Sequence, residues 1–294
     1  MVVNAAVDAA VFLLLLGAAV VGLTAADAGP GAGAADADAD GGADAVANVL
    51  ATSTATVNYT LSAARRAPGE SGADFERTAG PEFERTTHGS LAGLLARAAV
   101  GTAGFGDDPV THARDGFRSA ARDAVAARLE PIGLRVDAVW RPYPDSPVEG
   151  RVAVGEVPPA TTTTDTATLS VPAGTRPLAA NETRDFSSLS SAVARRTVET
   201  LAPAGQMRLA LRGDAPVSTL VGYRYDRLAA ELNTSVDSRT ADADTEAANR
   251  RLAAALAPRV ESDLRARYDS PEDAAAAVGV SEVRIVVRTW EAGR

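Results

Sequence analysis

The sequence predicts an α+β protein in which an N-terminal transmembrane helix precedes an extracytoplasmic domain, an antiparallel sheet packed against several amphipathic helices. Three observations support this prediction. Residues 9–26 are apolar and uncharged, several later segments carry apolar residues at helical spacing, and others alternate apolar and polar residues as half-buried strands do. We expect an anchor at 1–27, an acidic Gly/Ala/Asp linker at 28–45 and a domain at 46–294. In one alternative this domain consists of two subdomains divided near 173–187.

The apolar segment at residues 9–26 is long enough to cross a bilayer as a helix. Its 18 uncharged residues span about 27 Å at a rise of 1.5 Å per residue. A cleaved secretory signal is the alternative, and Thr24-Ala25-Ala26 would suit a signal peptidase. Because residues 1–6 carry no basic side chain, we favour an uncleaved anchor. The acidic Asp8 at its start is similar to the carboxylate of pilin-type anchors, although the basic-glycine processing site of pilins is missing.

Residues 28–42 predict a solvated linker, because they are almost entirely glycine, alanine and aspartate. The spacing of Asp36, Asp38, Asp40 and Asp44 matches the opening of a calcium-binding loop. Position twelve of that loop would be Ala47 rather than a glutamate, so we interpret the aspartates as a spacer.

Local signals place most of the later elements. Residues 46–61 are rich in threonine and partly alternating, which predicts a strand, whereas the charged residues 65–87 predict a loop. Ser90 caps a predicted helix that ends near Gly101. Further helices are predicted from Phe117 to Leu129 and in the regions 189–201, 216–232, 252–264 and 270–276, and strands are predicted at 134–140, 152–154, 167–171 and 283–287. We expect the strands that follow residue 134 to form an antiparallel meander with helices on one side.

The composition indicates adaptation to concentrated salt. All 29 basic residues are arginine, the chain has no lysine and no cysteine, and 38 acidic residues give a net charge of −9. At molar ionic strength the Debye length is about 3 Å, so surplus carboxylates repel each other only weakly. A GC-rich genome is an alternative source of the exchange of lysine for arginine. An acidic chain is also a poor ligand for nucleic acid, which we do not expect as a partner.

Three tripeptides match the acceptor pattern for N-glycosylation. They begin at Asn58, Asn181 and Asn233, three of only six asparagines in the chain. These candidate glycosylation sites favour a domain outside the cell. We therefore expect a single-pass protein of the cell membrane with most of the chain extracytoplasmic.

The sequence contains few residues suited to catalysis or metal binding. A hydrolytic triad would need His88 or His112 beside a serine such as Ser90 and an orienting acid such as Asp115, but no nucleophile-elbow pattern is present. His112 with Asp107 and Asp108 matches no metal-ligand spacing. The glycines of residues 101–106 have the wrong order for a dinucleotide fingerprint. We predict no catalytic, cofactor-binding or metal-binding residues and no enzymatic activity.

Three segments carry a resemblance to a known family. The opening VDAAVFLLLL at residues 7–16, the block HGSLAGLLA at residues 88–96 and the ending VRIVVRTW at residues 283–290 resemble a haloarchaeal family of uncharacterised membrane-anchored proteins. Such families are similar to components encoded beside type IV pilus and adhesion-pilus assembly systems. The resemblance implies an accessory role at the cell surface and brings no catalytic residue with it.

Two classes of function follow. The first is a non-enzymatic, membrane-tethered surface protein that binds pilus or envelope proteins. The second is a tethered extracellular enzyme or solute-binding module, whose site would consist of acids and arginines that the sequence alone does not bring together.

Overall fold

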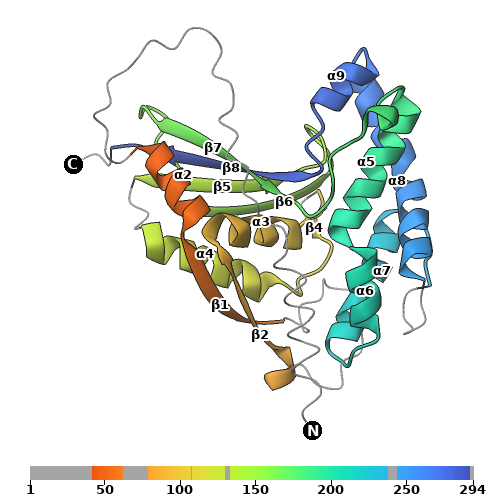
Figure 1. Ribbon diagram of the computed structural model, residues 1–294, viewed down its shortest axis with the longest axis horizontal. Helices are drawn as coiled ribbons and strands as arrows, with labels where there is room; N and C mark the ends of the chain where they lie inside the picture. Colours follow the sequence, from red (N-terminus) through yellow and green to blue (C-terminus); the bar gives the residue numbers. More distant parts are fainter. Residues whose placement is uncertain (1–41, 62–78, 107, 130–132, 238–243, 292–294) are drawn as a thin grey trace.

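The computed structural model describes residues 42–61, 79–106, 108–129, 133–237 and 244–291, and it has the predicted α+β architecture (Figure 1). Two antiparallel sheets and a group of helices form the molecule. Within these ranges no helix is both long and apolar enough to cross a membrane. The apolar segment 9–26 and the aspartates at 36, 38 and 40 lie outside the described residues.

The elements follow the chain in an order that separates sheet and helices. The first part contains α2 (Ala43–Thr52), β1 (Thr54–Thr60), η1 (Pro81–Phe83), β2 (Glu84–Ser90), α3 (Leu91–Gly101), β3 (Gly104–Phe105), β4 (Asp108–Pro109), α4 (Asp115–Leu129), β5 (Leu134–Trp140), β6 (Val148–Gly155) and β7 (Asp165–Pro172). The second part contains η2 (Ala180–Glu182), α5 (Phe186–Leu201), α6 (Ala204–Leu211), α7 (Val217–Glu231), α8 (Thr245–Arg267), α9 (Pro271–Ala276) and β8 (Glu282–Thr289).

The larger sheet has six strands in the order β4-β3-β6-β5-β8-β7, with every neighbouring pair antiparallel. The predicted strands are confirmed, but the predicted meander is wrong. β7 pairs with β8 rather than with β6, and β8 enters between β5 and β7. In this register Val136 lies opposite both Val154 of β6 and Val287 of β8.

One face of this sheet is covered by helices. The side chains of β5, β6 and β8 that point to this face are buried and apolar, among them Val136, Trp140, Val152 and Ile285. Helix α3 packs on this face, and Ser90 caps it as predicted by accepting the Gly93 N–H at 3.1 Å. A Cβ on Gly150 would collide with the carbonyl oxygen of Ala99, so this glycine lets α3 approach β6 closely.

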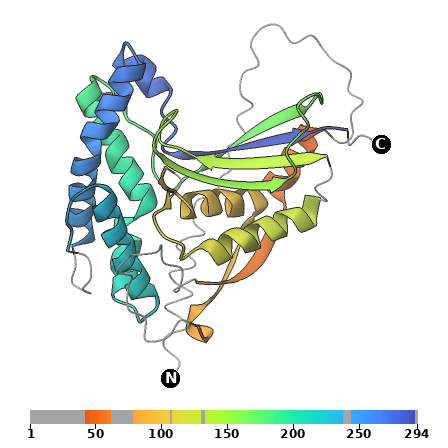
Figure 2. The same cartoon turned by 180° about the vertical axis from the view of Figure 1, so that it is seen from behind.

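The smaller sheet corrects two sequence predictions. Strand β1 is confirmed, but residues 46–52 belong to helix α2, which begins at Ala43, before the predicted domain start at residue 46. Residues 84–87 are not loop, because β2 pairs with β1 along its whole length. Helix α4 packs on β1, and the rings of Tyr59 and Phe117 are 5.1 Å apart. Helices α2, α3 and α4 thus share one side of the larger sheet (Figures 1 and 2).

Helices α5 to α9 form a helical arm beside the sheet, with α5 packed along α8 (Figures 1 and 2). The predicted helices are confirmed, and α8 continues through Pro258. Helix α6 is not predicted by the sequence.

Partly buried hydrogen bonds connect the helices of the arm to one another. Asn249 donates to the Ala202 carbonyl at 2.7 Å and accepts the Tyr225 hydroxyl at 2.9 Å, while Thr245 donates to the Ala204 carbonyl at 2.8 Å.

An ion pair joins the arm to the connection from β7. Arg196 of α5 is almost fully buried and lies 3.1 Å from Glu182 of η2, and it also donates to the Arg176 carbonyl. The pKa of Glu182 is lowered, first because it accepts the Ala179 N–H and then because Arg195 and Arg196 lie beside it. This connection runs through the region 173–187, where the sequence suggested a boundary between subdomains.

Helix α2 is fastened to the sheet at its first residue. The N–H of Ala43 donates to Asp165 of β7 at 2.7 Å, which satisfies a backbone donor that a helix start leaves open. Ala43, Ala47 and Leu50 are buried against the sheet side of the molecule. The chain therefore joins the domain at the edge strand β7.

Candidate functional site

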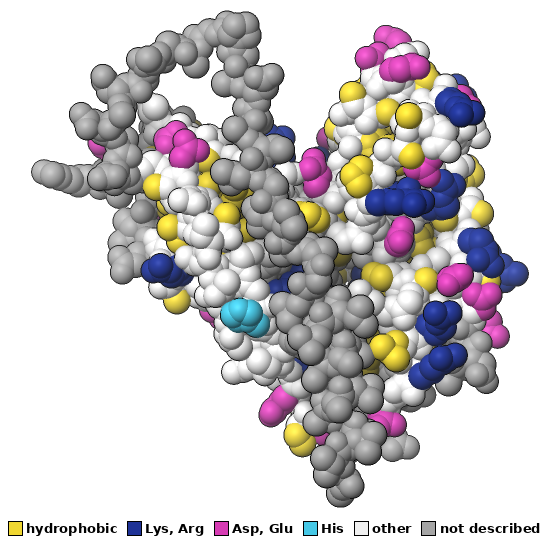
Figure 3. All heavy atoms as spheres, viewed as in Figure 1, with side chains coloured by type: hydrophobic (Ala, Val, Ile, Leu, Met, Phe, Trp, Pro, Cys, Tyr) yellow, Lys and Arg dark blue, Asp and Glu magenta, His cyan; other side chains and the backbone are white. Residues whose placement is uncertain are grey.

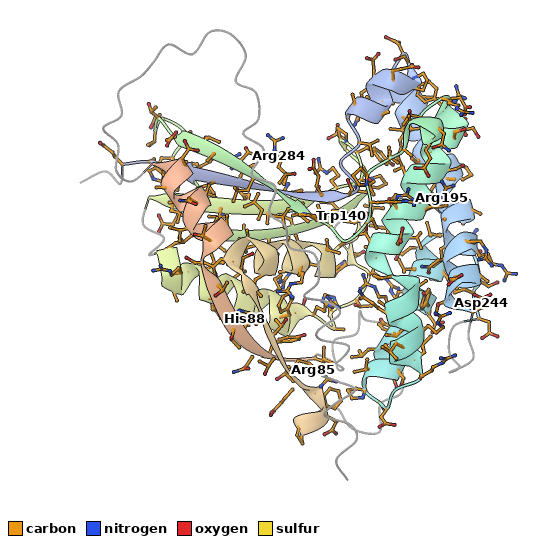
Figure 4. The ribbon with its side chains drawn as sticks, viewed as in Figure 1. Arg85, His88, Trp140, Arg195, Asp244 and Arg284 are labelled. Atoms are coloured by element: carbon orange, nitrogen blue, oxygen red, sulfur yellow. The ribbon has the colours of Figure 1, made fainter. Side chains whose placement is uncertain are left out.

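The two histidines do not build a catalytic site among the described residues. His88 lies exposed on β2, with its Nδ1 3.1 Å from the Thr56 hydroxyl of β1 (Figure 4). His112 Nδ1 lies 3.0 Å from Asp115 at the start of α4, so these two residues do meet. Ser90 is used as a helix cap elsewhere, which removes the nucleophile named for that triad.

The remaining candidates for chemistry have structural roles. In the described ranges no group of three or more His, Asp or Glu side chains is arranged to hold a metal ion. Asp108 lies in β4, whereas Asp107 is outside the described residues. Gly104 belongs to β3, where a Cβ would overlap the Asp108 carbonyl oxygen, so the tight β3–β4 turn explains this glycine.

The second face of the six-stranded sheet differs from the face that α3 covers. No helix of the described chain packs on it, and it is exposed on the side of the sheet opposite α3 (Figures 1 and 2). We call it the open face. Its charged side chains are Arg135, Asp137 and Arg141 of the β5 segment, Glu149 and Arg151 of β6, and Glu282, Arg284 and Arg288 of β8.

Ion pairs organise two regions of the open face. Asp137 is bridged by Arg135 and Arg288, each at 3.0 Å. Glu149 contacts Arg141 and, at 3.1 Å, Arg151. These pairs hold the arginine side chains in place, but they leave five arginines against three carboxylates in a protein whose overall charge is negative.

Arg284 lies between these two groups and is exposed. It stands opposite Val139 of β5 and Ser170 of β7, and its side chain points away from the sheet (Figure 4). Ser170 instead donates to Glu282. Within the described ranges no carboxylate forms an ion pair with Arg284. The center of the open face therefore presents a guanidinium that is available to an acidic group.

A shallow groove of about 540 Å³ lies where the sheet meets the helical arm. The Tyr143 hydroxyl donates to Asp263 of α8 at 2.7 Å, and Arg267 pairs with Asp145 at 2.9 Å. Burial, followed by the hydrogen bond to Asp263, raises the pKa of Tyr143. The phenol therefore stays protonated at neutral pH, and the groove serves as a joint between α8 and the β5–β6 connection.

The charge of Arg114, which lies before α4, acts on two other arginines, Arg97 of α3 and Arg224 of α7. We call these three residues the arginine cluster. Arg97 donates to the Gly93 and His88 carbonyls and to the Thr87 hydroxyl at 3.2–3.3 Å. Arg224 donates to the Leu201 carbonyl at 2.7 Å. Arg97 and Arg224 are half-buried, and Arg114 is exposed.

The electrostatics of the arginine cluster are unfavourable in the free protein. Burial, and after it the charge of Arg114, lower the pKa of Arg224 to about 10. The pKa of Arg97 is also lowered, chiefly by burial, with Tyr59 opposing the shift and Arg114 adding to it. Among the residues that the structure describes, none of the three guanidiniums has a carboxylate in ion-pair contact. Their hydrogen bonds go to neutral acceptors.

The three candidate glycosylation sites are all exposed. Asn58 lies on β1 and accepts the Thr86 hydroxyl at 2.7 Å, Asn181 lies in η2, and Asn233 follows α7 with a φ of 50°. Exposure makes each asparagine accessible, and its modification stays a prediction.

Sequence reasoning missed the open face and the arginine cluster. Alternation did predict one polar side for each of β5 and β8, but pairing of β8 with β5 was needed to align Asp137 with Arg288. For Arg97, Arg114 and Arg224 the sequence carries no local signal, because their separations of 17 and 110 residues match no repeat.

The fold and these surfaces define an α+β protein with an open, arginine-rich sheet face and an adjoining helical arm. Residues 7–290 match the Family of unknown function (DUF7284), so the chain belongs to this family. Neither a curated protein nor a solved structure matches it. The prediction of a family without a known function is thus confirmed, while the haloarchaeal origin and the relation to pilus assembly stay predictions.

Proposed function

We propose that this chain is a membrane-tethered, non-enzymatic surface protein of a halophilic archaeon that serves in a pilus-like or envelope assembly. Its open face binds an acidic segment of a partner protein in that assembly. The observation that carries the proposal is the exposed Arg284, with paired arginines on both sides and no helix above it.

The partner's chemistry follows from charge and from salt. An arginine-rich face on an acidic protein is complementary to carboxylates, and arginine binds a carboxylate with two parallel hydrogen bonds. At molar ionic strength attraction over a distance is screened, so only ion pairs in direct contact contribute. Arg135, Arg151 and Arg288 are held in position by their own carboxylates and lie on the same face of the sheet as Arg284. They require little further ordering when a partner binds.

The tether is supported by the sequence, in which the apolar segment 9–26 precedes α2. The hydrogen bond from Ala43 to Asp165 fixes the start of α2 at the sheet edge. The exposed positions of Asn58, Asn181 and Asn233 support placement outside the cell. The acidic surplus and the absence of lysine support a saline medium.

Charge reversal on the open face tests the proposal. The double variant R151E/R284E should lose at least about tenfold in affinity for an aspartate-rich peptide, measured by fluorescence anisotropy with the full chain at high salt. It should also lose the pilus or envelope proteins that co-purify with the native chain from salt-extracted membranes. The matched control R122E changes an exposed arginine on α4, on the other side of the sheet, and should bind like the native chain.

Two results would count against the proposal. Equal peptide binding by R151E/R284E and R122E would exclude the open face as the binding surface. Recovery of a lone monomer with no envelope protein, from membranes in which the assembly is intact, would exclude the assembly role.

The second candidate function is a tethered solute-binding module or extracellular enzyme. The arginine cluster favours the solute-binding form, because three guanidiniums without a carboxylate partner in the described chain suit a negatively charged solute. No arrangement of nucleophile and base in the described residues supports the enzymatic form.

A further inference from the structure

Strand β7 lies at one edge of the six-stranded sheet, beyond β8 (Figure 1). It runs for eight residues from Asp165 to Pro172, and within the described ranges no strand pairs with its outer side. Unpaired backbone groups of an edge strand attract other strands, so proteins often protect such edges with charges. Residues 166–171, Thr-Ala-Thr-Leu-Ser-Val, carry no charge, although the whole chain has a net charge of −9. The middle of this edge is therefore open to strand pairing.

The pairing with β8 identifies which backbone groups of β7 point outward. The Ala173 N–H donates to the Ser281 carbonyl at 2.8 Å, so the backbone groups of Ala173 face β8. Backbone groups alternate in direction along a strand, so those of Thr168 and Ser170 point away from β8. In the part of the chain that the structure describes, no acceptor receives either of these two N–H groups.

Both ends of this edge are closed by the chain itself. The Thr166 N–H, which points outward by the same alternation, donates to the side chain of Asp165 at 2.9 Å. Pro172 stands at the last outward position of β7, and it has no N–H to offer. The backbone donors left for a partner are thus those of Thr168 and Ser170, together with the carbonyls of the outward positions. They are enough to hold one short strand.

The same alternation brings this edge next to arginines of the open face. Thr166 and Ser170 are exposed on that face, opposite Arg288 and Arg284 of β8. A strand added to β7 would lie two strand spacings from β8, about 10 Å. A long arginine side chain and a carboxylate can meet at this separation over the small side chain between them. Glu282 lies further along β8, past Arg284, so the positive charge of β8 is confined to the stretch opposite residues 166–170.

We propose that the acidic segment of the partner protein binds as an added antiparallel strand on β7 and that acidic and aliphatic residues alternate in it. Residues paired with the outward positions of β7 place their side chains on the open face, where carboxylates reach Arg284 and Arg288. The residues between them lie beside Ala167 and Leu169, which are buried on the covered face. This inference rests on the proposed function, because it specifies how the acidic segment is bound.

The added strand would continue the order that the sheet already has. Every neighbouring pair in this sheet is antiparallel. In an antiparallel pair two opposite residues that exchange hydrogen bonds have their side chains on the same face. The acidic residues of the partner, paired with Thr168 and Ser170, would therefore direct their own N–H groups to β7. The aliphatic residues would direct theirs away from it.

The test compares two fluorescent peptides of identical composition, with the full-length chain at high salt and fluorescence anisotropy as the measurement. In the first peptide aspartate and valine alternate, Asp-Val-Asp-Val-Asp-Val-Asp. In the second all the aspartates precede the valines. The alternating peptide should bind at least about tenfold more tightly, because only its sequence places every carboxylate on one face of a strand.

Methylation of single backbone nitrogens in the alternating peptide tests the strand itself without a change of charge. Methylation of the third residue, an aspartate, removes an N–H that donates to β7 and should weaken binding at least about tenfold. Methylation of the fourth residue, a valine, changes an N–H that points away and should alter the affinity by less than about twofold. The two methylated peptides have the same charge and mass, so each is the control for the other.

A variant of β7 tests the same contact from the side of the protein. Thr168→Pro removes an outward N–H and keeps the pairing with β8, and it should weaken binding of the alternating peptide at least about tenfold. Thr163→Pro, an exposed change just before β7, is the matched control and should bind like the native chain. The methylated peptides use the native chain, so they test the inference even if Thr168→Pro does not fold.

Three results would overturn the inference. If both methylated peptides bind equally, or if the order of aspartate and valine does not matter, charge alone explains the binding. The proposed function then stands, provided that R151E/R284E still loses affinity. If R151E/R284E binds the peptide like the native chain, both proposals fail. If the native chain forms a dimer that the alternating peptide does not dissociate and Thr168→Pro does, a second copy occupies the edge instead.

Discussion

The two faces of the six-stranded sheet are built from the same strands and differ in almost every physical property. On the covered face Val136, Trp140 and Ile285 are fully buried beneath α3 and its neighbours. On the open face their sequence neighbours Asp137, Arg284 and Val286 remain partly or fully exposed. Figure 3 shows that charges are plentiful on other surfaces too, where acidic and basic side chains mix along the helical arm.

The comparison separates the face of the sheet that stabilises the fold from the face whose side chains are available for binding. Burial of apolar surface on the covered face supplies most of the stability of the sheet. Exposed ion pairs contribute little to stability, so the arginines of the open face are free to be used for binding.

The largest expected effect comes from comparing neighbours on β8 that point to opposite faces. Ile285→Ala should lower the free energy of unfolding by about 2–5 kcal/mol, because it leaves a cavity in a fully buried site. Val286→Ala on the open face should cost about 1 kcal/mol or less. Chemical denaturation of both variants measures the two values. Equal losses would break the comparison and show that the open face is covered in solution.

A smaller loss of stability is expected when the ion pair between Glu182 and the buried Arg196 is broken. Glu182→Gln should cost about 2 kcal/mol at neutral pH, since it leaves the buried Arg196 without its carboxylate. The lowered pKa of Glu182 sets the pH dependence. Its contribution is present above the ordinary pKa of 4.5 and is lost as the pH falls through the lower folded-state value.

Unfolding curves at several pH values would test this prediction. The difference between Glu182→Gln and the native chain should shrink below about pH 4, where the native carboxylate becomes protonated. Glu199→Gln, an exposed change on α5, is the control and should show no such pH dependence. A difference that stays constant down to acid pH would remove the assigned role of the Glu182–Arg196 pair.

The smallest loss of stability is expected for Asp137, whose ion pairs lie on the open face. Asp137→Asn should cost only about 0.5–1 kcal/mol at low salt and less at molar salt, because its pairs with Arg135 and Arg288 are partly exposed and screened. The exposed Asp123→Asn on α4 is the control, with no expected change. A loss above about 2 kcal/mol that persists in salt would make Asp137 a structural residue.

Elements with strong local periodicity could be predicted from the sequence, and elements held by pairing could not. β5, β8, α5 and α8 were predicted because apolar residues recur at the spacing of one element. β2 has only Thr87 buried within it and exists because it pairs with β1, a contact that no local pattern records. In α2 the buried Ala43, Ala47 and Leu50 have helical spacing, but the adjoining threonines favoured a strand.

The candidate sites were less predictable than the fold. Ser90, His112 and Asp115 could be named from the sequence, and the structure uses Ser90 as a cap and brings the other two together. Arg224 lies more than a hundred residues from Arg97 and Arg114, so no local pattern in the sequence relates it to them. A charge cluster between separate elements leaves no trace in spacing or composition.

The central position of β8 has a consequence for how the chain is made. Ser170 and Glu282, which touch across β7 and β8, are 112 residues apart, and the whole arm is synthesised between them. Until β8 emerges, β5 and β7 each expose an unpaired edge that can attach to the wrong chain. During translation the half-finished sheet is therefore exposed to aggregation, and pairing of the last strand completes the sheet.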